Sequence, residues 1–261
     1  MSEVSLSRVL AFWAERDPDR PALTYEGVTL SRVELEARTN RLARAYGELG
    51  VKADDYVTIA LPNGIEFVEA VFATWKLGAT PQPVSYRLPD HERQQIVELA
   101  EPSLVVGAPA SAHPGTVCVE PGFLPDADLS HAPLPEMTAK YWKAMTSGGS
   151  TGRPKLIVSK DPAAVDPMEE RLGLKTEKVC LIPGPLYHNG PFSLGMIALQ
   201  MGHHLIITSR FDAAQTLELI DGHGVNLLYL VPTMMQRMWR LPQKQRDGYN
   251  VGSLELVWHM A

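Results

Sequence analysis

The first hundred residues alternate between two patterns of apolar positions. Apolar residues recur at helical spacing in four segments: Val4 to Glu15, Ser31 to Leu49, Ile65 to Leu77 and His91 to Ala100. Short apolar runs typical of strands lie beside them: Pro21 to Tyr25, Val28 to Leu30, Tyr56 to Leu61, Thr80 to Val84 and Ser103 to Val106. Ser31 and Glu34 have the spacing of a capping box, and Gly50 and Gly78 follow two helix ends. This strand–helix–strand rhythm predicts an α/β fold, with mostly parallel sheets sandwiched by helices.

The same rhythm returns after residue 177. Four strands are expected: Lys178 to Leu181, Leu205 to Ile207, Val225 to Val231 and Ser253 to Trp258. Three helices are expected: Phe192 to Met201, Asp212 to His223 and Met234 to Leu241. Pro232-Thr233 is expected to separate a strand from the last helix, and Pro242 to Asn250 to form a loop. Between the two halves, residues 108–138 are rich in Pro, Ala, Gly and Asp and predict a loop with one strand, Thr116 to Glu120.

The stretch from Met145 to Lys155, Met-Thr-Ser-Gly-Gly-Ser-Thr-Gly-Arg-Pro-Lys, joins two predicted strands, Tyr141 to Met145 and Leu156 to Ser159. A tight turn needs one or two glycines, whereas this loop has three, together with four hydroxyl residues. Successive backbone N–H groups in a glycine-rich loop can bind an anion, and hydroxyls add donors. We therefore predict a polyphosphate-binding loop whose ligands come from Thr146, Ser147, Gly148, Gly149, Ser150, Thr151, Gly152 and Lys155.

Two other sequence patterns bear on this loop. The P-loop pattern fails, because Lys155 is followed by Leu156 and no helix is expected there. Gly148-Gly-Ser150-Thr-Gly152 does match the nucleophile elbow of α/β-hydrolases, which would make Ser150 a nucleophile. That elbow requires a helix after the turn, and Arg-Pro-Lys followed by a β-branched run is poor helix material. A hydrolase using Ser150 and a flexible hairpin without a ligand stay open as alternatives.

Composition narrows the class of protein. The chain has 261 residues, 45% of them hydrophobic, and a formal charge of −6, which argues against nucleic acid as a partner. There is no signal-peptide pattern and no run of about eighteen apolar residues, so we expect a cytoplasmic protein without a membrane span. Cys118 and Cys180 are far apart and predict free thiols. His203 and His204 are adjacent on a strand and point to opposite faces, so we predict a structural role and no metal site.

The loop also carries a family resemblance. Thr146 to Lys155 resembles the signature loop of adenylate-forming enzymes, the superfamily of acyl-CoA synthetases, luciferases and peptide-synthetase adenylation domains. The family pattern reads roughly Thr-Ser-Gly-Thr-Thr-Gly-x-Pro-Lys-Gly, and this chain differs by one extra glycine and by Leu156 in place of the last glycine. Leu30 to Gly50 and Trp75 to Val84 are similar to two further family segments, although packing alone explains both.

The resemblance implies roles for residues downstream of the loop. Pro185-Leu-Tyr-His-Asn-Gly190 resembles the family's Pro-Leu-Phe-His segment, whose histidine and aromatic residue border the carboxylate pocket. It implies an acyl pocket lined by Tyr187, His188, Asn189 and Gly190, with His188 as the catalytic residue. A strand leading into Val-Pro-Thr adds Pro232 and Thr233 to this pocket. From the residues alone, a satisfied core histidine is the preferred interpretation of His188, and only the resemblance reverses this.

The resemblance also implies an activity and an incomplete chain. The implied reaction activates a small carboxylic acid with ATP and Mg²⁺ to an acyl-adenylate, and then transfers the acyl group to coenzyme A. The family's Tyr-Gly-x-Thr-Glu and Thr-Gly-Asp motifs are not found, so we expect an N-terminal fragment, inactive alone, with the magnesium-binding glutamate and the C-terminal domain elsewhere. Its expected parts are a phosphate-loop subdomain, 56–176, and an acyl-pocket subdomain, 1–55 plus 177–261. Copies are expected to associate, as a homodimer or a higher assembly, through residues 177–261.

Three other functions remain open. One is a luciferase-like or aryl-acid adenylating enzyme with another acceptor. The others are the hydrolase and a non-catalytic nucleotide-binding module. Coenzyme A is preferred only on overall resemblance to fatty-acid-type ligases, and the acid itself is not predicted.

Overall fold

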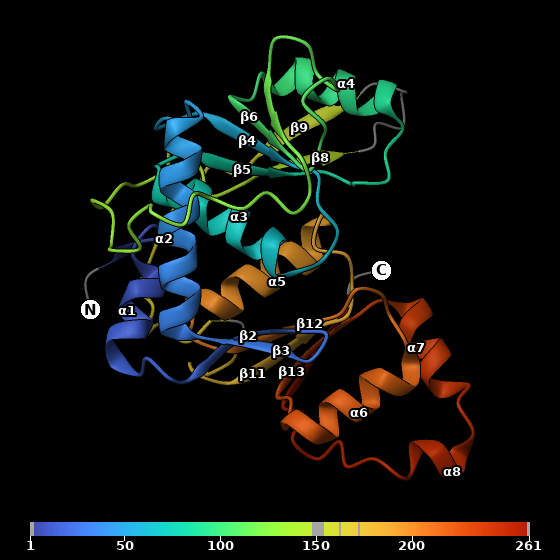
Figure 1. Ribbon diagram of the computed structural model, residues 1–261. Coiled ribbons are helices and arrows are strands. Elements are labelled where there is room, and N and C mark those ends of the chain that lie inside the picture. Colours follow the sequence, from blue (N-terminus) through green and yellow to red (C-terminus); the bar gives the residue numbers. More distant parts are fainter. Residues whose placement is uncertain (1–2, 148–153, 162, 172, 260–261) are drawn as a thin grey trace.

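Two sheets, connected by helices, organise the molecule (Figure 1). The computed structural model describes residues 3–147, 154–161, 163–171 and 173–259. Within these residues, the larger sheet has the strand order β14-β13-β11-β12-β2-β3 and the smaller one β5-β4-β6-β7. The strands of the larger sheet are β2 (Pro21–Tyr25), β3 (Val28–Ser31), β11 (Val179–Ile182), β12 (His204–Ile207), β13 (Leu227–Leu230) and β14 (Leu256–His259). Those of the smaller sheet are β4 (Tyr56–Ile59), β5 (Thr80–Pro83), β6 (Leu104–Val106) and β7 (Val117–Val119).

The pairing within both sheets is mostly parallel, as the sequence predicts. In the larger sheet only β2 and β3, joined by a tight hairpin, are antiparallel. All three pairs of the smaller sheet are parallel. Two further antiparallel pairs lie outside these sheets: β8 (Ala144–Ser147) with β9 (Lys155–Val158), and β1 (Val4–Ser5) with β10 (Ala164–Val165).

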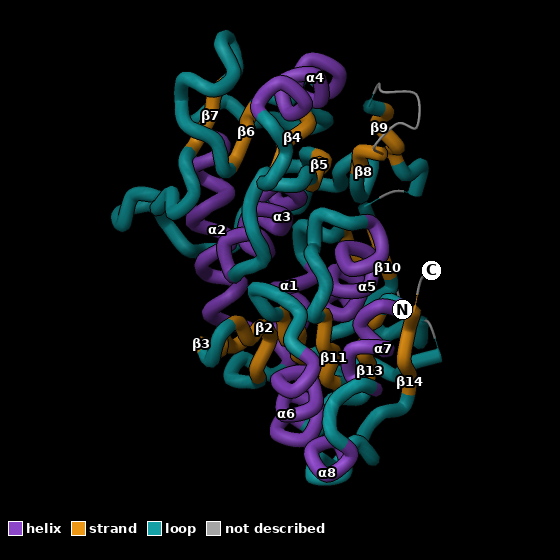
Figure 2. The backbone as a smooth tube through the Cα atoms, turned by 90° about the vertical axis from the view of Figure 1, so that its right-hand side faces the viewer, coloured by secondary structure: helices purple, strands orange, loops and turns teal. Residues whose placement is uncertain are grey.

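Helices fill the space between the sheets and cover their outer faces. Figures 1 and 2 show α2, α3 and α5 between the sheets, α4 outside the smaller sheet, and α6 outside the larger one. The helices are α1 (Val9–Arg16), α2 (Arg32–Glu48), α3 (Ile65–Lys76), α4 (Asp90–Ala100), α5 (Asn189–Gln200), α6 (Ala213–His223), α7 (Pro232–Trp239) and α8 (Gln243–Arg246). The predicted capping box starts α2, because Ser31 accepts from the Glu34 backbone while the Glu34 carboxylate accepts from Ser31.

The side-chain alternation of each strand divides the core. On β11, Cys180 and Ile182 pack into the central core between the sheets, whereas Leu181 packs into the cluster beneath α6. On β6, Leu104 faces the central core and Val105 packs under α4. Because both faces of these strands are buried, their sequences read as continuous apolar runs. No helix in the described ranges combines the length and apolarity needed to cross a membrane.

The N-terminal helix and the strand before the glycine-rich loop differ in their bounds from the prediction. Val4 was expected to start a helix, but Val4–Ser5 pairs with Ala164–Val165 and α1 begins only at Val9. The strand expected at Tyr141 to Met145 instead runs from Ala144 to Ser147, because the ladder with β9 extends it to the start of the glycine-rich loop.

Three boundaries near the C-terminal helices also differ from the prediction. Pro232 and Thr233, expected to precede a helix, are the first residues of α7, because proline is tolerated in the first turn. The helix expected from Phe192 begins at Asn189. Residues 242–250, expected to be a loop, contain the short helix α8.

Candidate active site

The hairpin β8–β9 presents the described ends of the predicted phosphate loop. Thr146 and Ser147 are half-buried at the end of β8, and the exposed Lys155 begins β9 directly opposite Ser147. Gly148, Gly149, Ser150, Thr151 and Gly152 lie outside the described residues. A strand, not a helix, follows the loop, which is inconsistent with the strand–turn–helix geometry of a nucleophile elbow at Ser150.

A buried amide anchors the hairpin to the smaller sheet. Gln82, on β5, is fully buried and donates through Nε2 to the hydroxyl of Thr146 at 3.3 Å. Its Oε1 accepts a hydrogen bond from the Thr58 hydroxyl on β4. The Thr146 hydroxyl therefore has a fixed donor on one side and can still donate its own hydrogen to a ligand oxygen.

Tyr187 and His188 occupy the turn between β11 and α5. His188 is the N-cap residue of α5, and its backbone N–H donates to the Pro185 carbonyl at 3.1 Å. The two rings lie 4.5 Å apart between centroids, and Tyr86 packs edge-on against Tyr187 at 6.2 Å. Partial desolvation lowers the pKa of His188, which favours the neutral imidazole at neutral pH. Asn189 and Gly190, also predicted for this site, form the first turn of α5.

Asn63 holds this turn in place, a role that the sequence did not indicate. Its amide nitrogen donates to the carbonyls of Gly184 (2.9 Å) and Thr208 (3.0 Å), and its oxygen accepts from the Leu186 N–H (2.8 Å). The sequence suggested only a turn at Asn63-Gly64, because its three partners lie 121 to 145 positions away.

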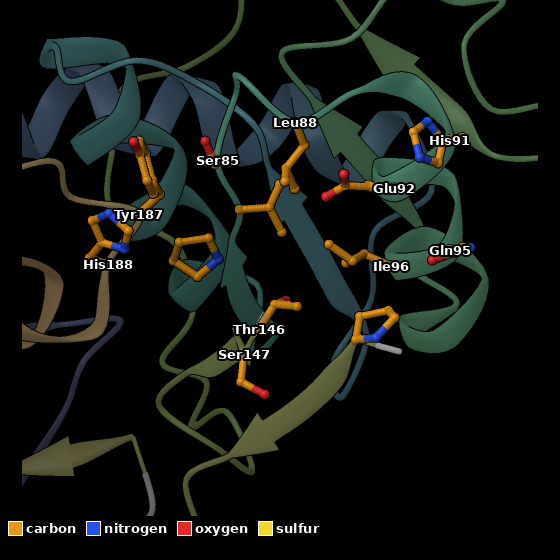
Figure 3. A pocket seen from close by; sticks show the side chains of 13 residues that line it. Ser85, Leu88, His91, Glu92, Gln95, Ile96, Thr146, Ser147, Tyr187 and His188 are labelled. Carbon is orange, nitrogen blue, oxygen red and sulfur yellow. The ribbon is translucent and has the colours of Figure 1, made fainter. Parts of the chain in front are cut away.

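Hairpin, turn and α4 enclose a cavity of about 500 Å³ (Figure 3). Figure 3 shows Thr146 and Ser147 on one side, Tyr187 and His188 on a second, and the α4 residues on a third. From α4 come His91, Glu92, Gln95 and Ile96. Polar groups therefore meet apolar walls in a hollow of the size that takes a small molecule.

A second cavity, of about 470 Å³, shares Thr146, Ser147, Tyr187 and His188 with the first. Its remaining wall includes Lys143 and Asn189. Lys143 precedes β8, and its Nζ donates to Asn189 Oδ1 at 2.6 Å and to the Ser193 hydroxyl. Burial lowers the pKa of Lys143 to about 8. The sequence placed Lys143 in a strand and gave no sign of this contact.

A third cavity, of about 570 Å³, is also lined by Tyr187 and is rich in arginine. Arg87, Arg210 and Arg237 line it, together with Tyr86 and Phe211. Arg87 lies over the Tyr86 ring and Arg237 over the Phe211 ring. Among the described residues, none of these arginines forms an ion pair with a carboxylate. Asp212 also lines the cavity, but its carboxylate accepts from the backbone N–H groups of Ala214 and Gln215. The three arginines outnumber this carboxylate, so the cavity is suited to an anion.

The other predicted positions lie apart from these cavities. Pro232 and Thr233 are exposed at the start of α7 and line none of the three cavities, although Met234 of the same helix lines the arginine-rich one. A ring nitrogen of His203 contacts the Lys175 carbonyl, whereas one of His204 contacts the Thr24 hydroxyl. In the described part of the chain, no three His, Cys, Asp or Glu side chains gather to form a metal site.

Comparison with known proteins assigns the chain to a family. A profile of the AMP-binding enzymes matches residues 10–261. Feruloyl-CoA synthase of an Amycolatopsis species is 29% identical over 246 residues, and 2,3-dihydroxybenzoate-AMP ligase of Bacillus subtilis is 28% identical over 271. The matches cover 88% and 92% of this chain but 49% of each relative, so the chain spans about half the length of the curated relatives it matches.

Solved structures give the same fold. The N-terminal domain of FACL13 from Mycobacterium tuberculosis superimposes with a TM-score of 0.81 at 19% identity, covering 98% of this chain and 69% of that one. With the profile match over nearly all of its length, the chain belongs to the AMP-binding family of adenylate-forming ligases and has the α/β fold of the N-terminal domain of acyl-CoA ligases.

Proposed function

We propose that this chain supplies the phosphate loop and one wall of the acid pocket of an enzyme that activates a carboxylic acid with ATP. In the proposed reaction a carboxylate oxygen attacks the α-phosphorus of ATP and pyrophosphate leaves. The thiol of coenzyme A then attacks the acyl carbon of the acyl-adenylate, and AMP leaves. The observation that carries the proposal is the cavity between the hairpin and Tyr187–His188, where loop hydroxyls and an aromatic–histidine pair face the same space.

The hairpin would bind the triphosphate. The hydroxyls of Thr146 and Ser147 and the ammonium of Lys155 stand at the two described ends of the loop and can donate to phosphate oxygens. Residues 56–176 would thus form the phosphate-loop subdomain, and 1–55 with 177–261 the acyl-pocket subdomain. Mg²⁺ supplied with ATP would neutralise part of the phosphate charge, so the protein's main contribution is positioning.

Tyr187 and His188 would border the reacting carboxylate. A neutral imidazole beside the acid avoids the tight ion pair that an imidazolium would form with the substrate carboxylate, and it can still donate a hydrogen bond. The names of the relatives, feruloyl-CoA synthase and 2,3-dihydroxybenzoate-AMP ligase, support an aryl or arylalkenyl acid ahead of a fatty acid.

The arginine-rich cavity supports coenzyme A as the acyl acceptor. Coenzyme A carries a diphosphate and a further phosphate on its ribose, and Arg87, Arg210 and Arg237 offer cationic groups without carboxylate partners in the described chain. Tyr187 lies in the wall that this cavity shares with the acid cavities, so a thiol arm could pass beside it.

ATP binding tests the phosphate-loop part on the 261-residue chain itself. We expect Mg·ATP to bind in isothermal titration calorimetry, and Ser147→Ala and Lys155→Gln each to weaken it about tenfold, the effect of losing one charged hydrogen bond. Lys244→Gln, an exposed lysine on α8, is the matched control and should leave binding unchanged. Unchanged ATP binding in both loop variants would refute the phosphate-loop assignment.

Turnover tests the proposed reaction on the full-length natural protein. We expect pyrophosphate release from ATP with a member of a panel of aryl, arylalkenyl and fatty acids, and a thioester when coenzyme A is present. Release with no thioester would assign another acyl acceptor. ATP binding without release, on folded protein and with every acid, would support the non-catalytic nucleotide-binding module instead.

A further inference from the structure

Lys143 is a buried cation at the edge of a cavity. Its side chain is 9% exposed, and its Nζ lies 4.2 Å from the centroid of the Trp142 ring. Its hydrogen-bond partners, Asn189 Oδ1 and the Ser193 hydroxyl, are both neutral. Across the residues that the structure describes, Lys143 forms no ion pair with a carboxylate. An ammonium has three N–H donors, so one is left for a further acceptor.

The charge of this lysine is poorly compensated. Burial lowers its pKa to about 8, and the attraction of Asp161 offsets this only in part. Lys143 is nevertheless mostly protonated at pH 7. Buried charges in proteins are normally paired, because removing an ion from water without a partner is costly. An anion entering the cavity that Lys143 lines would supply the missing charge and the missing acceptor.

The position of Lys143 separates it from the reacting end of the site. It lies four residues before Ser147 on an extended segment, a distance of about 13 Å along the backbone. Its partner Asn189 directly follows the N-cap His188, and its partner Ser193 lies one turn further along α5. An acid whose reacting carboxylate lies near Ser147 and His188 would therefore direct its remote end toward Lys143.

We infer that Lys143, positioned by Asn189 and Ser193, recognises a second carboxylate at the remote end of the acid substrate, which is then a dicarboxylic acid. The inference rests on the proposed function, because it assumes that the second cavity holds the acid. The recognition is non-covalent: one carboxylate oxygen accepts the remaining N–H of the ammonium, and the other carboxylate stays free to react.

Binding of matched acids to the 261-residue chain tests this without requiring turnover. The probes are terephthalate with benzoate, and adipate with hexanoate, each pair differing by one carboxylate. We expect each dicarboxylate to bind about tenfold to hundredfold more tightly than its partner, the range for one charged hydrogen bond. Trp142 fluorescence, measured against a Trp142→Phe background, reports occupancy beside Lys143.

Variants identify the group responsible. Lys143→Met should reduce the preference for the dicarboxylate to about twofold or less, and Lys143→Arg should retain it. Lys140→Met is the matched control, because Lys140 is exposed, lies over the Tyr141 ring, and comes from the same approach to the hairpin. Lys143→Gln is a second neutral variant should the methionine disturb the fold. NMR titration of Lys143 should show a higher pKa with terephthalate bound, a change that a merely structural lysine would not show.

Each other outcome overturns the inference. A preference that survives in Lys143→Met assigns the second carboxylate to another group. Equal binding within each pair shows that the site takes monocarboxylic acids, which leaves the proposed function intact. Failure of all four acids to bind, while ATP binds, removes the acid cavity and the inference but not the phosphate loop. Loss of ATP affinity in Lys143→Met, measured without acid, would make Lys143 a phosphate ligand instead.

Discussion

Two regions of the molecule contain a buried lysine. In the first, the chain also supplies the carboxylate that pairs with the lysine, whereas in the second the lysine has no carboxylate within ion-pair distance among the described residues. Lys76, at the end of α3, is 3% exposed and its Nζ lies 2.7 Å from a Glu36 carboxylate oxygen on α2. Lys143, beside the acid cavity, is 9% exposed and has only neutral hydrogen-bond partners. Burial lowers the pKa of both lysines, and in Lys76 the Glu36 charge opposes the shift. The lysine in the packed interface between α2 and α3 is thus paired with a carboxylate, whereas the lysine beside the cavity is not.

A buried charge without a charged partner in the chain indicates where a ligand of opposite charge can bind. A buried pair such as Lys76–Glu36 contributes little net stability, but removing one member leaves the other uncompensated. Lys143 is already poorly compensated in the ligand-free chain, because the attraction of Asp161 offsets its burial only in part. A fold can retain such a cost where function uses it, as at binding sites generally.

Removing the Glu36 charge should destabilise the protein most. In Glu36→Gln the Lys76 ammonium stays buried without a carboxylate partner, and the Ser7 carbonyl lies 3.4 Å from its Nζ. We therefore expect a loss of about 3–5 kcal/mol in the free energy of unfolding. Urea denaturation measures this, and Glu48→Gln, exposed at the end of the same helix, is the control. Adding Lys76→Met to Glu36→Gln should recover most of the loss. A small effect in the single variant would show that the pair is not needed in the core.

The burial of Lys143 should make the free energy of unfolding depend on pH. Its folded-state pKa, about 8, is below the ordinary value of 10.5, so between these values the unfolded chain binds more protons than the folded one. The free energy of unfolding should therefore rise with pH, by about 3 kcal/mol from this residue between pH 7.5 and 10.5.

Urea denaturation of wild type and Lys143→Met across this range isolates the effect, because other titrating groups cancel in the difference. We expect Lys143→Met to be the more stable protein at pH 7.5 and to lose that advantage by pH 10.5. A constant difference between the two proteins would mean that Lys143 is not held in a depressed state.

The two lysines also show what the sequence could predict. Periodicity placed α3, and the Ser31–Glu34 spacing placed the start of α2, because both signals are local. The glycine-rich loop indicated the position of the site, because its glycines and hydroxyl residues are the groups that bind phosphate. Neither the Lys76–Glu36 pair, 40 positions apart, nor the Lys143–Asn189 contact, 46 apart, leaves a local pattern. The role of Asn63 and the strand Val4–Ser5 were not predicted for the same reason, because their partners lie more than a hundred positions away.

The exposed ion pair between Lys178 and Glu255 should contribute little to the free energy of unfolding. Lys178 and Glu255 join the starts of β11 and β14, and their side chains are 27% and 46% exposed. Water solvates both charges, so Lys178→Gln should cost less than about 1 kcal/mol in the free energy of unfolding. Because mobile ions screen exposed charges, 1 M NaCl should abolish even this difference, while the loss in Glu36→Gln should persist. A cost in Lys178→Gln as large as that in Glu36→Gln would show that burial does not set the value of a charge partner here. The contrast between Lys76 and Lys143 would then no longer point to a ligand.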